Sequence, residues 1–141
     1  MADSRATAVW SGDLQSGRGT VSVASKAFAD QEITWQARAE RTGGTSPEEL
    51  IAAAHASCFC MALSNGLGKA GTPPERLNVS ATVTFIPGQG ITKIELDLAA
   101  KIPGISEDAF RQAAEGAKSG CPVSKALAGV PDISLNARLE S

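Results

Sequence analysis

The fold of this chain is decided by the stretch Ser46-Pro47-Glu48-Glu49-Leu50-Ile51-Ala52-Ala53-Ala54-His55-Ala56-Ser57-Cys58-Phe59-Cys60-Met61-Ala62-Leu63. Ser46 can cap a helix, Pro47 suits the first helical position, and Glu49 completes a capping box. The helix is expected to run to about Asn65-Gly66. It is apolar nearly all round, which is typical of a helix buried on several sides.

Alternating segments on both sides of this helix predict strands. Before it they are Thr7 to Trp10, Gly19 to Ala24 and Glu32 to Ala39. After it, Asn78 to Phe85 and Thr92 to Ala100 alternate apolar with polar residues, and a Pro-Gly turn between them predicts an antiparallel hairpin. Two more helices are expected, from Ser106 to Gly120 and from Pro122 to about Ala128, followed by a strand over Ile133 to Leu139.

Strands grouped around helices indicate an α+β fold, and 141 residues without an internal repeat or linker indicate one domain, 1–141. A helix buried on several sides often needs a second subunit to complete its core, so an intertwined homodimer is expected. The N-terminus lacks the apolar stretch of a signal peptide, and the run from Ile51 to Leu63 is short of the roughly 20 residues that cross a bilayer. We therefore expect a soluble, cytoplasmic protein with no membrane partner.

The composition argues against nucleic acid as a partner. The formal net charge is -2, so there is no basic footprint, and aromatic residues make up only 4% of the chain, with no tyrosine. No phosphate-cradling motif appears at a strand–helix turn, so no nucleotide cofactor is expected.

Three cysteines carry the most distinctive chemistry. Cys58 and Cys60 differ by two helical positions and point about 200° apart, so they cannot serve one site. The chain has one histidine and no paired C-x-x-C motifs, which argues against structural zinc. In a reducing compartment, three cysteines favour transient or catalytic thiol chemistry over a disulfide framework. The competing interpretation is that each cysteine packs as a small buried hydrophobic residue. This interpretation is favoured most strongly for Cys60.

Local physics indicates that Cys121 is the more acidic thiol. It lies at the expected start of a helix, before Pro122, where N–H groups and the helix dipole stabilise a thiolate. Cys58 lies mid-helix and needs an outside cation, for which Arg38 and Arg18 are the candidates.

Three further residues each have two possible roles. Glu48 either favours the helix N-terminus or orients an arginine through paired hydrogen bonds. Arg38, expected mid-strand, is either solvated or functional. His55 is either a core histidine or the base of a Cys-His hydrolase, a class that nothing else in the chain supports.

The two cysteine motifs carry a resemblance. Residues 44–59, GTSPEELIAAAHASCF, and 120–127, GCPVSKAL, resemble the signatures of the OsmC subgroup of the OsmC/Ohr proteins. Further similar segments are Trp10-Ser11-Gly12-Asp13-Leu14, Gly19-Thr20-Val21-Ser22, Ile91-Thr92-Lys93-Ile94 and Pro103-Gly104-Ile105. The resemblance covers nearly the whole chain. It implies an α+β fold of two intertwined chains with two active sites at the dimer interface.

The resemblance also implies roles for single residues. Cys58 matches the peroxidatic cysteine, Cys121 the resolving cysteine, and Glu48 the carboxylate that pairs with a catalytic arginine. Arg38 falls where the OsmC branch places that arginine, and Arg18 is a second choice because the Ohr branch takes it from the N-terminal loop. Cys60 departs from the pattern, which usually has serine there. If Cys58 faces the interface pocket, Cys60 is expected to face the core.

The implied activity is thiol-dependent reduction of organic hydroperoxides and, less readily, hydrogen peroxide, in defence against oxidative or osmotic stress. A Cys58 sulfenic acid would condense with Cys121 to a disulfide, which a lipoylated protein or small dithiol would reduce, with no metal or other cofactor. The alternatives are a peroxide sensor or small-ligand module without turnover, and a stress-induced structural protein with inert thiols.

Overall fold

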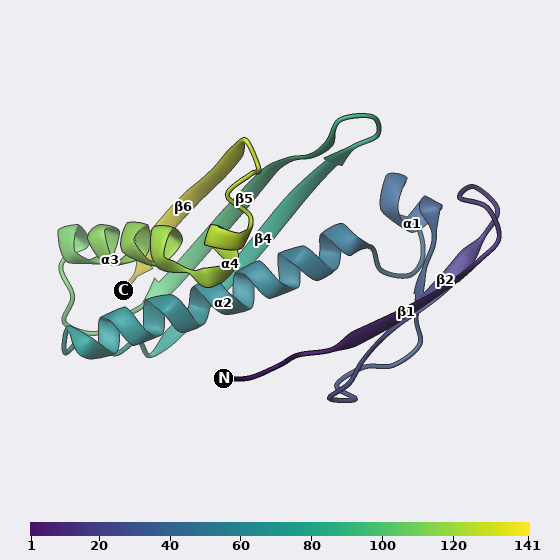
Figure 1. The fold of residues 1–141 in the computed structure, drawn as a ribbon. Helices are drawn as coiled ribbons and strands as arrows, with labels where there is room; N and C mark the ends of the chain where they lie inside the picture. Colours follow the sequence, from purple (N-terminus) through teal and green to yellow (C-terminus); the bar gives the residue numbers. More distant parts are fainter.

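The computed structural model describes residues 1–141 and divides the strands between two small sheets (Figure 1). The first sheet has the order β1-β2-β3, all antiparallel: β1 (Ala6–Ser11), β2 (Arg18–Val23) and β3 (Gln31–Ile33). The second has the order β4-β5-β6: β4 (Arg76–Ile86), β5 (Gly90–Lys101) and β6 (Asp132–Glu140). The expected hairpin is confirmed, since β4 and β5 are antiparallel, whereas β6 lies parallel to β5.

Four helices accompany the sheets: α1 (Trp35–Ala39), α2 (Pro47–Lys69), α3 (Glu107–Gly120) and α4 (Pro122–Ala126). The predicted cap of α2 is confirmed, because the Ser46 hydroxyl accepts a hydrogen bond from the Glu49 N–H. The full capping box is not formed, since the Glu49 carboxylate accepts from the Thr45 hydroxyl instead. Ser106 caps α3 by accepting from the Ala109 N–H. Helix α2 is longer than expected. It continues through Gly66 and Gly68, so these glycines do not end it.

The prediction of a strand from Glu32 to Ala39 is wrong. Strand β3 ends at Ile33, and Thr34 caps the short helix α1 by accepting a hydrogen bond from the Ala37 N–H at 3.0 Å. Threonine with a free hydroxyl competes well as a helix cap, and the residues after it are compatible with a helical turn. Arg38 therefore lies in the last turn of α1 and not in a strand.

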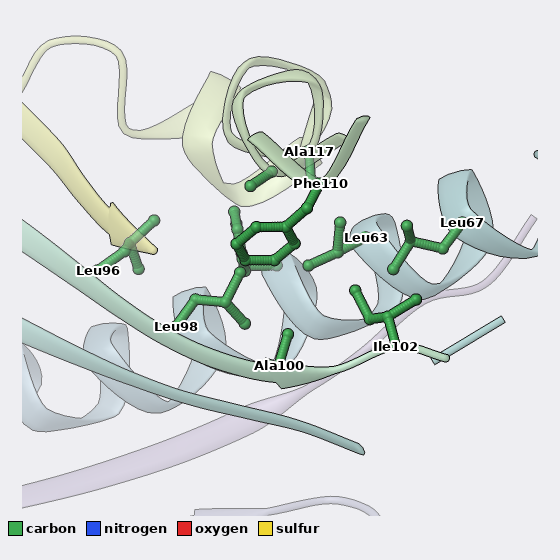
Figure 2. Packing of buried hydrophobic residues seen from close by; sticks show 10 residues of the cluster. Leu63, Leu67, Leu96, Leu98, Ala100, Ile102, Phe110 and Ala117 are labelled. Carbon is green, nitrogen blue, oxygen red and sulfur yellow. The ribbon is translucent and has the colours of Figure 1, made fainter. Parts of the chain in front are cut away.

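The main core lies between α2, α3 and the second sheet (Figure 2). Ile94, Leu96 and Leu98 are buried on one face of β5, as their alternation predicts. Leu96 and Leu98 pack with residues from both helices, and the ten-residue cluster consists of Phe59, Leu63, Leu67, Leu96, Leu98, Ala100, Ile102, Phe110, Ala114 and Ala117.

Helix α2 is buried along one side only in this chain, which corrects the expectation of burial on several sides. His55, Phe59, Leu63 and Leu67 recur every four residues and form the buried stripe. The other faces carry small residues that no element of the same chain covers, among them the exposed Ala53, Ala54 and Ser57.

The length argument against a membrane span is also wrong, because α2 has 23 residues and could cross a membrane by length and composition. A core helix of a folded domain passes the same test. Here α2 packs its buried stripe against a sheet and α3 and carries the buried carboxylate of Glu48, which favours the core-helix interpretation.

Candidate active site

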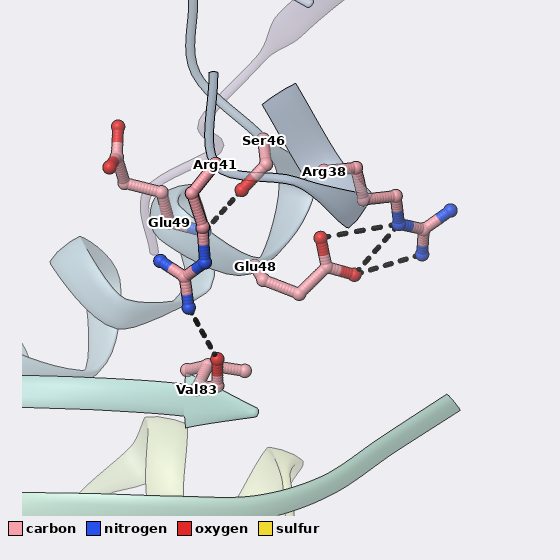
Figure 3. A network of polar contacts seen from close by, with 6 residues as sticks. All are labelled: Arg38, Arg41, Ser46, Glu48, Glu49 and Val83. Atoms are coloured by element: carbon pink, nitrogen blue, oxygen red, sulfur yellow. Dashed lines mark hydrogen bonds and ion pairs between the residues drawn. The ribbon is translucent and has the colours of Figure 1, made fainter. Parts of the chain in front are cut away.

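An ion pair joins α1 to the beginning of α2 (Figure 3). The Nε of Arg38 donates to both carboxylate oxygens of Glu48 at 3.0 and 3.2 Å, and Nη2 donates to Oε1 at 2.9 Å. The side chain of Glu48 is only 4% exposed, whereas that of Arg38 is 34% exposed. The sequence-based hypothesis that Glu48 orients an arginine is therefore supported, and the guanidinium keeps one edge free for another ligand.

Aromatic side chains fix the other side of the guanidinium. The Arg38 Cζ lies 4.2 Å from the centre of the Phe85 ring, and Trp35 packs edge-on against the same ring at 6.2 Å. The two contacts come from the end of β4 and the beginning of α1. Arg38 is thus held by a buried carboxylate and an aromatic face, which leaves it little freedom to move.

The loop before α2 is shaped by a close approach between backbones. Gly44 has φ of +64°, and a Cβ there would lie 2.4 Å from the carbonyl oxygen of Glu32. The next residue, Thr45, donates its N–H to that oxygen at 2.8 Å. Glycine is required at this point, because the loop must return α2 to the end of β3 and so bring Glu48 beside Arg38.

The two proposed redox cysteines lie together although 63 positions separate them in the sequence. Cys58 is on α2 and half-buried. Cys121 is fully buried at the junction of α3 and α4, where its N–H donates to Ala117 and its carbonyl accepts from Lys125. Helix α4 packs on α2 and carries this junction (Figure 1). The fold thus brings Cys58 and Cys121 together, which the sequence alone did not determine.

The neighbourhood of the pair favours Cys121 as the thiolate. Burial and the Cys121 side chain raise the pKa of Cys58. Burial also opposes ionisation of Cys121, but the backbone of Ser124, the Cys58 thiol and the Ser124 hydroxyl outweigh it and lower the pKa of Cys121. The Cys121 sulfur accepts no capping hydrogen bond from the first turn of α4, so the backbone N–H groups there act on it only as nearby dipoles. This agrees with the sequence-based argument from the helix N-terminus.

Neither candidate arginine, Arg38 or Arg18, lies beside the Cys58 of the same chain. Glu48 and Cys58 are ten residues apart on α2, which is about 15 Å along the helix axis, and Arg38 is held at the Glu48 end. Arg18 lies on β2, where its side chain is 75% exposed and pairs loosely with Glu32 at 3.9 Å. The structure therefore unites Arg38 with Glu48 and Cys58 with Cys121, but it does not unite the two pairs.

A second contact between the same helices was missed from the sequence. His55 is fully buried, and its Nε2 lies 2.7 Å from the Oγ of Ser124. This contact favours the interpretation of His55 as a core histidine. One feature of the sequence agrees with this contact. His55 precedes Cys58 by three residues, and Ser124 follows Cys121 by three residues, so each lies about one helical turn from its cysteine.

Cys60 does not face the core as expected. It is half-buried and lines a surface hollow together with Met61, Ser64 and Asn65 of α2, with Pro74 before β4 and with Arg76 at the start of β4. The buried stripe of α2 takes the side of Phe59, so Cys60 falls beside it. Partial burial raises the pKa of this thiol.

We expect Cys60→Ser to leave the rate of the hydroperoxide reduction implied by the resemblance within about twofold, because a thiol with a raised pKa reacts slowly. After one equivalent of hydroperoxide, peptide mass mapping should show a Cys58–Cys121 disulfide with Cys60 free. A major Cys60–Cys121 product would assign a catalytic role to Cys60 and contradict this prediction.

No group of three or more His, Cys, Asp or Glu side chains converges as metal ligands would. The principal surface hollows are lined by residues other than Cys58 and Cys121.

Comparison with known proteins identifies the family. The family model described as OsmC-like protein matches residues 39–136, which include Glu48, Cys58 and Cys121, whereas Arg38 lies one residue before the matched segment. The chain belongs to the OsmC-like family. It is 43% identical over 135 residues to "Peroxiredoxin OsmC" of Escherichia coli, covering 94% of this chain and 93% of that protein.

Two further proteins are similar to this OsmC-like chain. One is "Organic hydroperoxide resistance protein-like 1" of Staphylococcus saprophyticus, which is 31% identical over 122 residues and is matched over 84% of this chain and 85% of its own. The other is the crystal structure of an OsmC-like protein from Mycoplasma pneumoniae, with a TM-score of 0.72, 20% identity and 99% of both chains covered. The latter supports the α+β fold alone.

Proposed function

We propose that this OsmC-like protein is a cysteine-based peroxidase that reduces organic hydroperoxides and, more weakly, hydrogen peroxide. The observation that carries the proposal is the pairing of Cys58 with Cys121 across the α2–α4 contact. A relative named as a peroxiredoxin and another named for organic hydroperoxide resistance support the choice of substrate.

The proposed reaction has three steps. The Cys58 thiolate attacks the distal peroxide oxygen, the O–O bond breaks, and the leaving alkoxide takes a proton and departs as alcohol or water. Cys121 then attacks the Cys58 sulfenic acid, forming a disulfide and releasing water. A dithiol of low molecular weight or a lipoylated protein returns two electrons, and the two protein thiols are restored.

The test is steady-state consumption of an organic hydroperoxide, compared with hydrogen peroxide, with a dithiol and then a monothiol as reductant. Sustained turnover with the dithiol and a preference for the organic peroxide are expected. Oxidation that stops after one equivalent even with dithiol present would favour the sensor alternative. Thiols that remain unlabelled in the native protein would favour the inert one.

We further propose that the working form is a homodimer. The chain exposes 8510 Å², whereas a compact monomer of 14.4 kDa exposes about 6,800 Å². Strand β1 is exposed along its whole length, and exposed apolar side chains include Val9, Trp10, Leu14 and Met61. The excess of about 1,700 Å² matches the surface that one subunit of a stable dimer buries. Sedimentation should therefore give about twice the chain mass.

The dimer would also resolve the separation of the two pairs. A twofold axis near Ala53, midway between Glu48 and Cys58 on α2, would place the Arg38–Glu48 pair of one chain beside Cys58 of the other. The small exposed side chains of Ala54 and Ser57 would let the two helices approach closely. A guanidinium there would lower the pKa of Cys58 and meet the charge developing on the departing oxygen.

We expect Arg38→Ala to slow Cys58 oxidation about a hundredfold, because it removes an oriented cation from the developing charge. Arg18→Ala should stay within about twofold, since Arg18 is exposed and loosely paired. Glu48→Ala should give a smaller loss than Arg38→Ala, in the same direction. Stopped-flow measurement of sulfenate formation compares the three variants, and a larger loss for Arg18→Ala would assign the catalytic arginine to the N-terminal sheet.

Subunit mixing tests whether Arg38 acts across the dimer. Arg38→Ala and Cys58→Ser chains are each expected to be nearly inactive, but a heterodimer of the two contains one site with both groups intact. When the two variants are mixed in equal amounts, half of the randomly formed dimers are heterodimers, and each has one intact site of two. About a quarter of the wild-type activity per chain should therefore be restored. Activity that stays at the sum of the two separate variants would show that Arg38 serves the Cys58 of its own chain.

A further inference from the structure

Two matched contacts join α2 to the α4 region. One is the Cys58–Cys121 thiol pair, and the other is the hydrogen bond between His55 Nε2 and Ser124 Oγ at 2.7 Å. Each partner precedes or follows its cysteine by three residues on the same stretch of backbone, so the two contacts lie about one helical turn apart. Such an arrangement fixes the register of the two elements against each other.

The buried environment decides the direction of the histidine–serine hydrogen bond. His55 is fully buried, and its Nδ1 has no hydrogen-bond partner. A proton on Nδ1 would be an unsatisfied buried donor, which is rarer and more costly than a bare acceptor. The proton therefore sits on Nε2, and His55 donates to Ser124. Burial also lowers the pKa of His55, which keeps the ring neutral.

A hydroxyl that accepts from His55 has its own proton free for another acceptor. Ser124 lies in the first turn of α4, three residues after the N-cap residue Cys121, and is only 8% exposed. The Ser124 side chain contributes to lowering the pKa of Cys121. The hydroxyl proton of Ser124, which the contact with His55 leaves unused, is thus available to the neighbouring Cys121 sulfur.

We infer that His55 and Ser124 are positioning residues for the resolving step, which hold Cys121 beside Cys58 and hydrogen-bond its sulfur in the thiolate form. This inference rests on the proposed role of Cys121. An attacking thiol works best when its pKa is near the ambient pH, and a more acidic thiol also leaves more readily when the disulfide is reduced. The same pair of residues therefore assists both formation and reduction of the Cys58–Cys121 disulfide.

Other charged groups lie on the outer side of Ser124. Glu115 and Lys118 of α3 and Lys125 of α4 line a surface hollow that Ser124 also borders. From α2, the titratable groups facing this region are Cys58 and His55. The lysines would stabilise a thiolate only at a distance, so removing them should change the pH profile of Cys121 less than removing the Ser124 hydroxyl.

The test follows ring closure without peroxide, in protein carrying Cys60→Ser. An aromatic disulfide reagent should label half-buried Cys58 before fully buried Cys121, and attack by Cys121 then releases a second coloured thiolate. Ser124→Ala should slow this release roughly tenfold near neutral pH and move its pH midpoint upward by about one unit. His55→Leu should act in the same direction.

Conservative variants separate this role from a structural one. Ser124→Thr keeps a hydroxyl and His55→Gln keeps an N–H donor, so both should close within about threefold of the parent protein. Ser119→Ala is the matched control, because it removes an exposed hydroxyl two residues before Cys121 that bonds only to the Glu115 carbonyl. It should change neither rate nor midpoint.

An unchanged pH midpoint in both Ser124→Ala and His55→Leu would overturn the inference, whether or not closure slows. Equal slowing in Ser124→Thr and Ser124→Ala would overturn it as well. Because the assay uses no peroxide, these outcomes are distinct from failure of the proposed peroxidase activity, which would appear as absent turnover in a protein whose disulfide closes normally.

Discussion

Cys58→Ser should abolish peroxide turnover. A serine hydroxyl is too weakly acidic to supply an anionic nucleophile here, and neither remaining cysteine can replace it. Cys121 is fully buried, and partial burial raises the pKa of Cys60. Loss of the only nucleophile that can reach the peroxide should leave less than about a tenth of the rate, a barrier increase above roughly 1.4 kcal/mol.

The measurement is hydroperoxide consumption with excess dithiol, and Cys60→Ser is the control because it makes the same chemical change two residues away on α2. The control should keep its activity. Thermal unfolding of both variants checks that the core beside Phe59 is intact. More than about a tenth of the wild-type rate in Cys58→Ser would move the peroxidatic role to another thiol.

Cys121→Ser should reduce one equivalent of hydroperoxide and then stall. Cys58 is untouched in this variant, so sulfenic acid still forms, but no thiol lies beside it to release water and close a disulfide. A sulfenic acid left with peroxide proceeds to sulfinic acid. Peptide mass spectrometry should find two added oxygen atoms on the peptide that contains Cys58.

The pre-steady-state and steady-state rates separate the two cysteines. In Cys121→Ser the burst of one equivalent should remain while dithiol-supported turnover falls, whereas in Cys58→Ser both should disappear. The lost neighbour also removes an interaction that raises the pKa of Cys58, so the burst should not be slower at neutral pH. A complete catalytic cycle with dithiol in Cys121→Ser would contradict its resolving role.

Local signals were sufficient for most of the secondary structure. Ser46 with Pro47 and Glu49 predicted the beginning of α2, and the alternation around Ile94 predicted the buried face of β5. These features depend on contacts between near neighbours in the chain. The predicted strand over Glu32–Ala39 failed because a threonine cap at Thr34 outweighed the apolar alternation.

The placement of the candidate site residues could be predicted only in part. The motif around Cys58 and that around Cys121 marked both thiols, and the helix N-terminus predicted which would be the more acidic. The partner of His55 could not be recognised, because Ser124 is 69 positions away and reaches it only when α4 packs on α2. The side on which Cys60 lies depended likewise on which stripe of α2 the sheet covers.

By itself, the sequence determined most of the helices and strands, the Ser46 cap of α2, the alternation of the second sheet and the chemical identity of the thiols. All of these depend on residues within a few positions of one another. Only the tertiary structure decided the pairing of Cys58 with Cys121, the hydrogen bonds that hold Arg38 at Glu48, and the hydrogen bond between His55 and Ser124. Those contacts join segments far apart in the chain. Packing of the apolar faces brings them together, and the polar groups meet where that packing places them.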